Sequence, residues 1–292
     1  MSEYVVGLGE VLWDVFPSGK KLGGAPANFA FHVSQFGLDG LAVSAVGRDA
    51  LGEETVEELY RNGLHYHIDR VEEPTGTVQV TLDAQGVPSY EIKTGVAWDN
   101  IPFTKELAEI AASTRAVCFG SLAQRSPVSR ETIGWFLEAV PSDCLKVFDI
   151  NLRQHFYTKE VLEESMKRAN ILKINEEEIA VVAEMFGFPG LGYEEASRKL
   201  MDLYTLDMVI LTCGATGSYV FHKEGMSYLV TPKVKVADTV GAGDSFTGAF
   251  VASILSGKPV GEAHRIAVEV SAYVCTRSGA MPQLPPSLVK DV

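Results

Sequence analysis

Short, mainly apolar runs that alternate with amphipathic helical patterns limit the possible folds of this 292-residue sequence more than any other feature. The apolar runs are YVVGLG at 4–9, LAVSAVG at 41–47, RAVCFG at 115–120, CLKVFDI at 144–150, NILKI at 170–174 and DMVILT at 207–212. Strands that are apolar on both faces are typical of a parallel sheet covered by helices on both sides. Helical patterns lie between the runs, for example at 26–37, 53–63, 129–140, 158–169 and 175–187. The alternation therefore predicts an α/β fold with a mainly parallel, doubly wound central sheet.

The segment at 76–92, GTVQVTLDAQGVPSYEI, breaks this alternation. Its apolar and polar residues alternate with period two around Gln85-Gly86, and no crossover helix follows, which predicts a β-hairpin. An edge hairpin of the main sheet and a lid over a pocket are equally compatible with the local pattern.

The charge balance argues against two classes of partner. With 38 acidic and 25 basic residues the formal net charge is −13, so we expect no broad basic face for nucleic acid or an anionic membrane. The segment MSEYVVGLGE has no signal-peptide pattern and no apolar run has the length of a membrane span, so we expect a cytoplasmic protein. The four cysteines have no zinc-like spacing, and we expect them to be free thiols.

Polar residues and glycines follow four of the apolar runs. They are Glu10 and Asp14, Asn151 and Arg153, Asn175 and Glu178, and Thr212, Gly214 and Gly217. Each could serve ordinary local structure: Asn175 could cap a helix, and Gly214 could form a tight turn. Because ligands bind beyond the carboxyl ends of the strands in an open parallel sheet, the shared location of these residues predicts a polar crevice.

The stretch DTVGAGDSFTGAF at 238–250 places a glycine-rich turn at the start of an apolar helix. Backbone amides at such a start can surround a negative group, helped by the helix dipole. No lysine or arginine lies between Asp238 and Gly257, so within this segment only amides supply positive charge. The same helix start is expected to lower the pKa of Asp244. A close helix–sheet contact that requires small residues is the alternative explanation for the glycines.

Two common phosphate-binding motifs are missing from the sequence. No G-x-x-x-x-G-K-S/T occurs, and GAGDSF has Phe246 at the last glycine of G-x-G-x-x-G. This argues against a P-loop enzyme and against a typical nicotinamide dehydrogenase.

Two longer motifs resemble the signatures of the ribokinase-like, or PfkB, family of carbohydrate kinases. They are GGAPANFAFHVSQFG at 23–37, followed by Gly47, and DTVGAGDSFTGAFV at 238–251, and the similarity extends over essentially the whole chain. GEVLWDVFP at 9–17 and GSLAQR at 120–125 further resemble the fructokinases of that family. The resemblance implies a single three-layer α/β/α kinase domain over 1–292, with a small β lid formed mainly by about 10–22 and 70–98.

The resemblance also implies roles for the residues that match the family motifs. Asp244 corresponds to the catalytic base, and Gly241, Ala242 and Gly243 to the anion hole around the transferring phosphoryl group. The implied sugar-binding residues are Asp14, Gly24, Asn28 and Arg153.

Further matches concern the nucleotide and two cations. Asn175 and, in TCGATG, Thr212, Gly214 and Gly217 would bind ATP. Glu178 of the N-x-x-E element would organise Mg²⁺ through water, although the acids at 176 and 177 leave open which one does so. Backbone carbonyls at Asp238 and Val240, with the loop near Gly279, match the K⁺ site of the family.

The implied activity is transfer of the γ-phosphoryl group of ATP to a sugar hydroxyl, with D-fructose as the first candidate and fructose 6-phosphate as product. Ribose, 2-keto-3-deoxygluconate or a nucleoside are alternative acceptors. A non-catalytic sugar or nucleotide sensor is a further alternative, but Asp244 argues against it because a sensor needs no base. The expected partners are the sugar, ATP and a second copy of the chain, paired through the β lid.

Overall fold

The computed structural model describes residues 3–17, 19–82, 88–290 and 292. The strands are β1 Tyr4–Leu8, β2 Leu12–Phe16, β3 Gly19–Gly23, β4 Asp39–Gly47, β5 His65–Val71, β6 Thr77–Leu82, β7 Pro88–Ile92, β8 Thr114–Gly120, β9 Leu145–Asp149, β10 Ile171–Asn175, β11 Met208–Cys213, β12 Gly217–His222 and β13 Gly225–Leu229. The helices are α1 Ala25–Ser34, α2 Ala50–Arg61, α3 Lys105–Ala112, α4 Pro127–Ala139, α5 Lys159–Arg168, α6 Glu176–Met185, α7 Tyr193–Tyr204, α8 Ala242–Leu255, α9 Val260–Cys275 and α10 Pro286–Val289, with short 3₁₀ helices η1 Ala97–Asp99 and η2 Leu122–Arg125.

The main sheet has nine strands in the order β13-β12-β11-β10-β9-β8-β1-β4-β5. The pairs from β11 through β5 are parallel, whereas β12 and β13 extend the β11 edge in antiparallel register. All six apolar runs singled out in the sequence form strands of its parallel part. The prediction of a mainly parallel α/β sheet is therefore confirmed, and the antiparallel edge is an addition to it.

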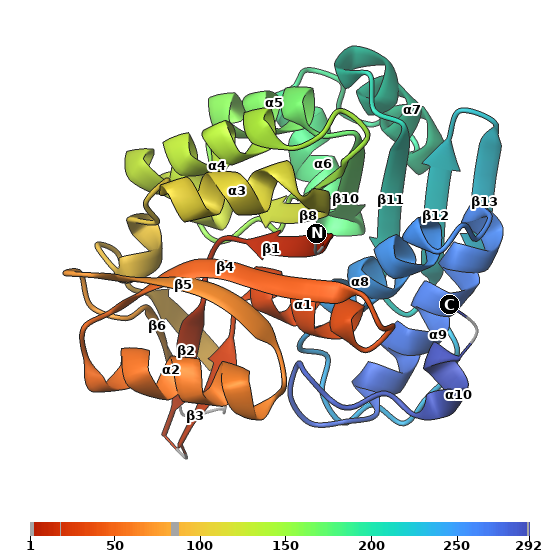
Figure 1. Ribbon diagram of the computed structural model, residues 1–292. Coiled ribbons are helices and arrows are strands. Elements are labelled where there is room, and N and C mark those ends of the chain that lie inside the picture. Colours follow the sequence, from red (N-terminus) through yellow and green to blue (C-terminus); the bar gives the residue numbers. More distant parts are fainter. Residues whose placement is uncertain (1–2, 18, 83–87, 291) are drawn as a thin grey trace.

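Helices cover both faces of this sheet (Figure 1). Helices α3 to α7 pack on one face and share one large apolar core with it, while α1, α8 and α9 contribute to a second core on the opposite face. Neighbouring residues of β1 face different cores, since Val5 belongs to the second core and Val6 to the first. This alternation is why the strand has no polar residue from Val5 to Leu8.

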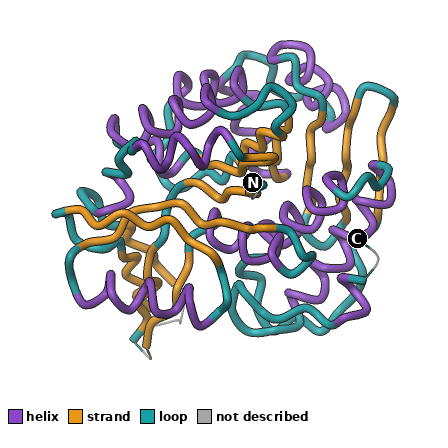
Figure 2. The backbone as a smooth tube through the Cα atoms, viewed as in Figure 1, coloured by secondary structure: helices purple, strands orange, loops and turns teal. Residues whose placement is uncertain are grey.

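A second, four-stranded sheet lies beside the main one, in the order β3-β2-β6-β7 (Figures 1 and 2). Strands β6 and β7 pair antiparallel, so the predicted hairpin segment contributes to a separate small sheet and not to an edge of the main sheet. The predicted turn at Gln85-Gly86 lies outside the described residues. The division of 1–292 into one kinase domain with a lid at about 10–22 and 70–98 stays a prediction.

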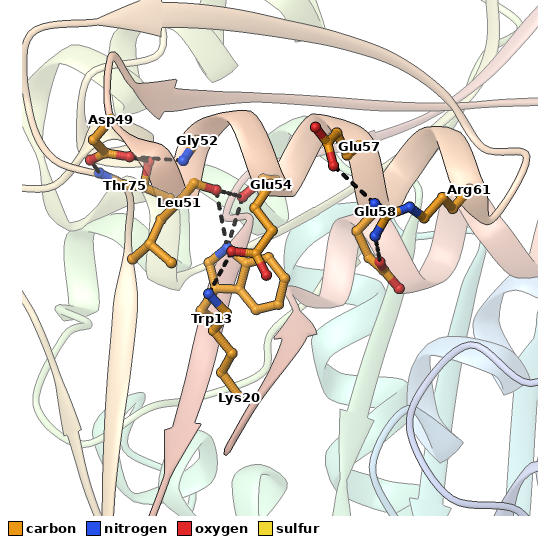
Figure 3. A network of polar contacts seen from close by, with 11 residues as sticks. Trp13, Lys20, Asp49, Leu51, Gly52, Glu54, Glu57, Glu58, Arg61 and Thr75 are labelled. Atoms are coloured by element: carbon orange, nitrogen blue, oxygen red, sulfur yellow. Dashed lines mark hydrogen bonds and ion pairs between the residues drawn. The ribbon is translucent and has the colours of Figure 1, made fainter.

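Helix α2 attaches the small sheet to the main one (Figure 3). Trp13 on β2 donates its indole N–H to Thr55 Oγ1 of α2 at 2.9 Å. Lys20 on β3 lies 4.9 Å from the centre of the Trp13 ring and forms an ion pair with Glu54. Asp49 caps the start of α2 by accepting a hydrogen bond from the backbone of Gly52. The small sheet is thus held by side chains from both of its first two strands.

The structure tests two expectations, that the cysteines are free thiols and that no segment spans a membrane. All four cysteines are free, and Cys118, Cys144 and Cys213 are buried. Across the described ranges, no helix combines the length and the apolar character needed to cross a bilayer.

A buried ion pair joins the segment after β7 to the two 3₁₀ helices. The guanidinium of Arg125 forms two bonds with the carboxylate of Asp99, at 2.8 and 2.9 Å, and both side chains are less than 10% exposed. It also lies 3.9 Å from the centre of the Trp98 ring and donates to the carbonyl of Lys93. Loss of one partner would leave a buried charge without its counterion.

We therefore expect Asp99→Ala to lower the free energy of unfolding by about 3–5 kcal/mol, measured by urea denaturation. Glu109→Ala, which removes a solvent-exposed partner of Lys105, serves as the control and is expected to cost less than about 0.5 kcal/mol. Equal losses in the two variants would contradict a special contribution from the buried pair.

Candidate active site

Two helix starts from distant parts of the sequence meet beyond the carboxyl ends of the parallel strands. Asn28, in the first turn of α1, donates its Nδ2 hydrogen to Asp244 Oδ2 in the first turn of α8 at 2.7 Å. Asn28 is buried, and its own Oδ1 has no hydrogen-bond partner within the described part of the chain. One predicted sugar-binding residue therefore fixes the orientation of the predicted base.

Glycine is required immediately before both helices. Gly24 and Gly241 are the N-caps of α1 and α8, with φ values of 123° and 77°. A β-carbon at Gly24 would lie 2.3 Å from the carbonyl oxygen of Glu10, and one at Gly241 would lie 2.7 Å from that of Ala280. Close packing thus explains part of both motifs. At these two glycines the contact is with loop backbone, whereas the alternative interpretation proposed a helix–sheet contact for 238–250. Neither N-cap residue has a side chain that could cap the first amides of its own helix.

Acidic side chains line a recess around the two helix starts. Its polar lining includes Glu10, Asp149, Asn151 and Asp244, and its apolar lining includes Pro26 and Phe119. Glu10 and Asp149 are buried, and Asp244 is partly buried. Such a recess can bind hydroxyl groups, which donate hydrogen bonds to carboxylates.

The environment of Asp244 raises its pKa to about 6. Burial is the main cause, and the nearby charge of Asp149 adds to it; the hydrogen bond from Asn28 and the charges of Lys173 and Arg153 oppose the rise. The expectation that the helix start would lower this pKa is therefore wrong. The dipole is a modest term confined to one turn, and desolvation by the surrounding protein outweighs it.

Lys173 is a positive group that the local sequence pattern did not predict. It lies on β10, is 7% exposed, and forms an ion pair with Asp149 at 3.2 Å. A β-carbon at Gly243 would be only 3.0 Å from Lys173 Nζ. The partial positive charge at the start of α8 is therefore supplemented by the full charge of Lys173 from β10. A lysine in the middle of an apolar run was the signal in the sequence.

The remaining predicted sugar-binding residues are more exposed. Asp14 lies on β2 and is partly buried, and burial raises its pKa against the opposing charges of Arg153 and Lys21. Arg153 is exposed, and its charge also lowers the pKa values of Glu10 and Asp244. The charge of Arg153 thus acts on three acids from different parts of the chain.

A second, larger groove is lined by residues of α8 that are next in the chain to those lining the recess. Its volume of about 790 Å³ is within the range of small-molecule sites. The predicted residues that line it are Asn175, Thr212, Gly214, Gly217, Ala242 and Gly243. Apolar side chains, among them Val236, Phe246 and Val268, form part of its wall and could contact a flat ring. These residues have no signal in the sequence, because apolar side chains in a loop and in two helices carry no local signature.

Glu178 does not line this groove, whereas Glu176 and Glu177 do. Its Oε2 accepts a hydrogen bond from the backbone of Asn175 and its Oε1 one from the backbone of Leu152, both at 2.9 Å. With Asn175, whose side chain accepts from the backbone N–H groups of both 177 and 178, it forms a capping box at the start of α6. The helix-capping alternative for Asn175 is therefore realised. A role of Glu178 in ordering Mg²⁺ stays a prediction.

The donor set suits magnesium that arrives with a nucleotide. Among the described residues, no cluster of three or more Asp, Glu, His or Cys side chains could hold a metal ion by itself. Magnesium is commonly bound through one or two carboxylates, water and the phosphates of a substrate. The acids beside the groove fit that arrangement.

Asp238 organises the loop that precedes α8. Its Oδ1 accepts from the backbone of Val240 and its Oδ2 from the backbone of Gly279, each at 3.1 Å. Burial opposes ionisation of this carboxyl, but these hydrogen bonds and the charge of Lys21 hold its pKa below the ordinary value. The three residues predicted near a K⁺ site are thus adjacent, and binding of K⁺ stays a prediction.

The comparisons with known proteins agree with this geometry. The sequence profile of the pfkB family carbohydrate kinases matches residues 7–286. The chain belongs to this family. A putative sugar kinase of Pyrococcus horikoshii is 31% identical over 244 residues, covering 81% of this chain and 74% of that protein. A fructokinase of Salmonella typhimurium is 28% identical over 299 residues, covering 95% of each chain.

Solved structures show the same fold. The crystal structure of the Pyrococcus horikoshii kinase in complex with ATP has a TM-score of 0.78 at 29% identity, over 94% of this chain and 93% of that one. A fructokinase with bound ATP from Xylella fastidiosa has a TM-score of 0.85 at 19% identity, over 100% and 99% of the two chains. The chain is an ATP-dependent carbohydrate kinase with a ribokinase-like fold, which removes the alternative of a non-catalytic sensor.

The raised pKa of Asp244 has a consequence for the stability of the kinase. A carboxyl whose pKa is higher in the folded chain than the ordinary 3.8 destabilises the fold when it is ionised. This penalty is absent below about pH 4, develops as the pH rises through about 6, and is complete above about pH 7. The stability advantage of Asp244→Asn over the wild type should therefore grow with pH. We expect the difference in free energy of unfolding between the two proteins to be larger at pH 8 than at pH 4, by on the order of 1–2 kcal/mol.

Urea denaturation of both proteins at the two pH values measures this difference. Asp143→Asn, at an exposed aspartate, is the control and should show no such gain. Parallel pH dependence of the wild type and Asp244→Asn would contradict the raised pKa.

Proposed function

We propose that this kinase is a fructokinase, which transfers the γ-phosphoryl group of ATP to D-fructose and releases fructose 6-phosphate and ADP. The position of Asp244 is the observation that supports phosphoryl transfer at this place. Its carboxylate lines the acidic recess, while Ala242 and Gly243, directly before it in the chain, line the larger groove. The recess has a volume of about 10 Å³ in this structure, so it would have to open to admit a sugar. A sugar there and ATP in the groove would meet at this helix start.

In the proposed reaction Asp244 accepts the proton of the attacking hydroxyl. The hydroxyl oxygen forms a bond to the γ-phosphorus, and the bond from that phosphorus to the bridging oxygen of ADP breaks. With a pKa of about 6 the carboxylate is mostly ionised at pH 7, and Asn28 holds it in place. A base with a pKa close to the working pH is more effective than an ordinary aspartate.

The amides of Gly241 and Gly243 would stabilise the negative charge on the transferring group, and one such donor is worth roughly 3–4 kcal/mol. The amide of Ala242, which donates to the carbonyl of Thr239 at 3.3 Å, would have to exchange that bond to join them. Lys173 adds a fixed positive charge next to Gly243. Magnesium bound with ATP would neutralise part of the phosphate charge. Because the transition state of phosphoryl transfer is loose, positioning and charge supply most of the catalysis.

Fructose is favoured over other acceptors by two short segments and one relative. GEVLWDVFP and GSLAQR resemble the fructokinases, and the Salmonella typhimurium fructokinase aligns over 95% of this chain. Ribose, 2-keto-3-deoxygluconate and nucleosides are the acceptors against which this assignment is tested.

A panel of these acceptors, assayed by ADP release with magnesium-ATP, tests the proposal. We expect the highest kcat/KM with fructose, and Asp244→Asn is expected to lower kcat by at least about a hundredfold with unchanged ATP binding. A higher kcat/KM with another acceptor would contradict the fructose assignment. Near-normal turnover of Asp244→Asn would contradict its role as the base.

The buried pair Asp149–Lys173 allows the pKa of the base to be moved in both directions. Asp149 raises the pKa of Asp244 and Lys173 lowers it. In the pH profile of kcat/KM we expect Asp149→Asn to shift the acid limb, near pH 6 in the wild type, to lower pH, and Lys173→Met to shift it to higher pH. Lys167→Met, at an exposed lysine of α5, is the control. Shifts of both variants in the same direction would contradict this account.

A further inference from the structure

Glu10 is a buried acid in the recess to which the proposed reaction assigns no role. It follows β1 directly, is 3% exposed, and lines the recess together with Asp244. Its Oε2 atom has no hydrogen-bond partner in the part of the chain that the structure describes. Buried polar atoms in native proteins nearly always have a partner in the protein, in ordered water or in a ligand. The unpaired carboxyl oxygen beside the recess is therefore a position where such a partner can bind.

The surroundings of Glu10 restrict what that atom can be. Burial raises the pKa of Glu10 to about 7, and the charge of Asp244 also raises it, against the N–H groups of Glu10 and Ala25 and the charge of Arg153. At neutral pH the carboxyl is therefore close to half ionised and can accept or donate a hydrogen bond. A neutral hydroxyl meets both forms, whereas a second anion would be repelled by Asp149 and Asp244, which line the same recess.

We infer that Glu10 binds a second hydroxyl of the acceptor sugar, different from the one that Asp244 deprotonates. This assignment rests on the proposed function and adds a specificity-determining residue to it. Two carboxyl groups on one recess would fix a polyhydroxylated acceptor at two points, so that only one of its hydroxyls reaches Asp244. Asn28 Oδ1, which is also buried and unpaired, is a further acceptor beside the same base.

A purely structural role for Glu10 is the competing explanation. The backbone N–H of Ala25, at the start of α1, interacts with this carboxyl, and the N-cap Gly24 offers no side chain. A helix-capping residue would affect stability when removed, without any dependence on the hydroxyls of the sugar. The two roles therefore differ in a measurable way.

The test compares wild type, Glu10→Gln and Glu10→Ala with the best acceptor of the panel and with its deoxy analogues, for fructose the 1-, 3- and 4-deoxy sugars. In the wild type we expect kcat/KM to be at least about tenfold lower for one deoxy analogue than for the intact sugar. That analogue lacks the hydroxyl bound by Glu10, so the carboxyl stays unpaired. In Glu10→Ala the intact sugar should lose a similar factor through KM, with the KM for ATP unchanged, and the discrimination against that analogue should disappear. Glu109→Ala is the control at an exposed acid.

Unchanged discrimination in both Glu10 variants would overturn the inference, and so would lower thermal stability with an unchanged KM for sugar. Glu10→Gln keeps the shape of the side chain and covers the case in which Glu10→Ala does not fold. If the wild type prefers another sugar, the fructose assignment fails and the Glu10 test proceeds with that sugar. If the wild type phosphorylates no sugar of the panel, the proposed function fails. Glu10 is then tested by the rise in Tm that each sugar of the panel causes. An equal rise in the wild type and in Glu10→Ala overturns the inference.

Discussion

The hydrogen bond between Asn28 and Asp244 joins the two halves of the site. It connects the starts of α1 and α8, which are more than 200 residues apart in the sequence, at a distance of 2.7 Å. Both helices can begin this close to the sheet edge only because Gly24 and Gly241 precede them in conformations that favour glycine. The recess and the larger groove lie on either side of this junction, so the geometry of both depends on it.

Buried charges set the chemistry at this junction. Burial and Asp149 raise the pKa of Asp244, while Lys173, itself paired with Asp149, opposes the rise. An isolated charge in this environment would be costly, whereas a balanced set keeps the base ionised near neutral pH and places a cation next to Gly243. Glu10 is the member of the set whose second oxygen has no partner among the described residues. The set therefore combines charge balance with one free position for a ligand.

The parallel sheet followed from periodicity because each of its strands has both faces covered, and two covered faces leave a mainly apolar run in the sequence. Strands β12 and β13 escaped prediction since they form an antiparallel edge, with more polar residues and no crossover helix. The segment at 76–92 was identified as a hairpin, but its alternating pattern is the same for any half-covered sheet. Only the pairing of β2 with β6 placed it in a separate sheet.

The sequence by itself determined the order of the parallel strands, the glycines that open α1 and α8, and the place of Asp244 three residues after Gly241, because these depend on local backbone geometry and on contiguous motifs. Tertiary structure decided the pKa of Asp244, the position of Lys173 beside Gly243, and the contact of Glu178 with the backbone of Leu152. These properties depend on distances between residues from different strands and on the exclusion of water. Neither quantity is encoded in the spacing of residues along the chain, since both arise only when the layers pack.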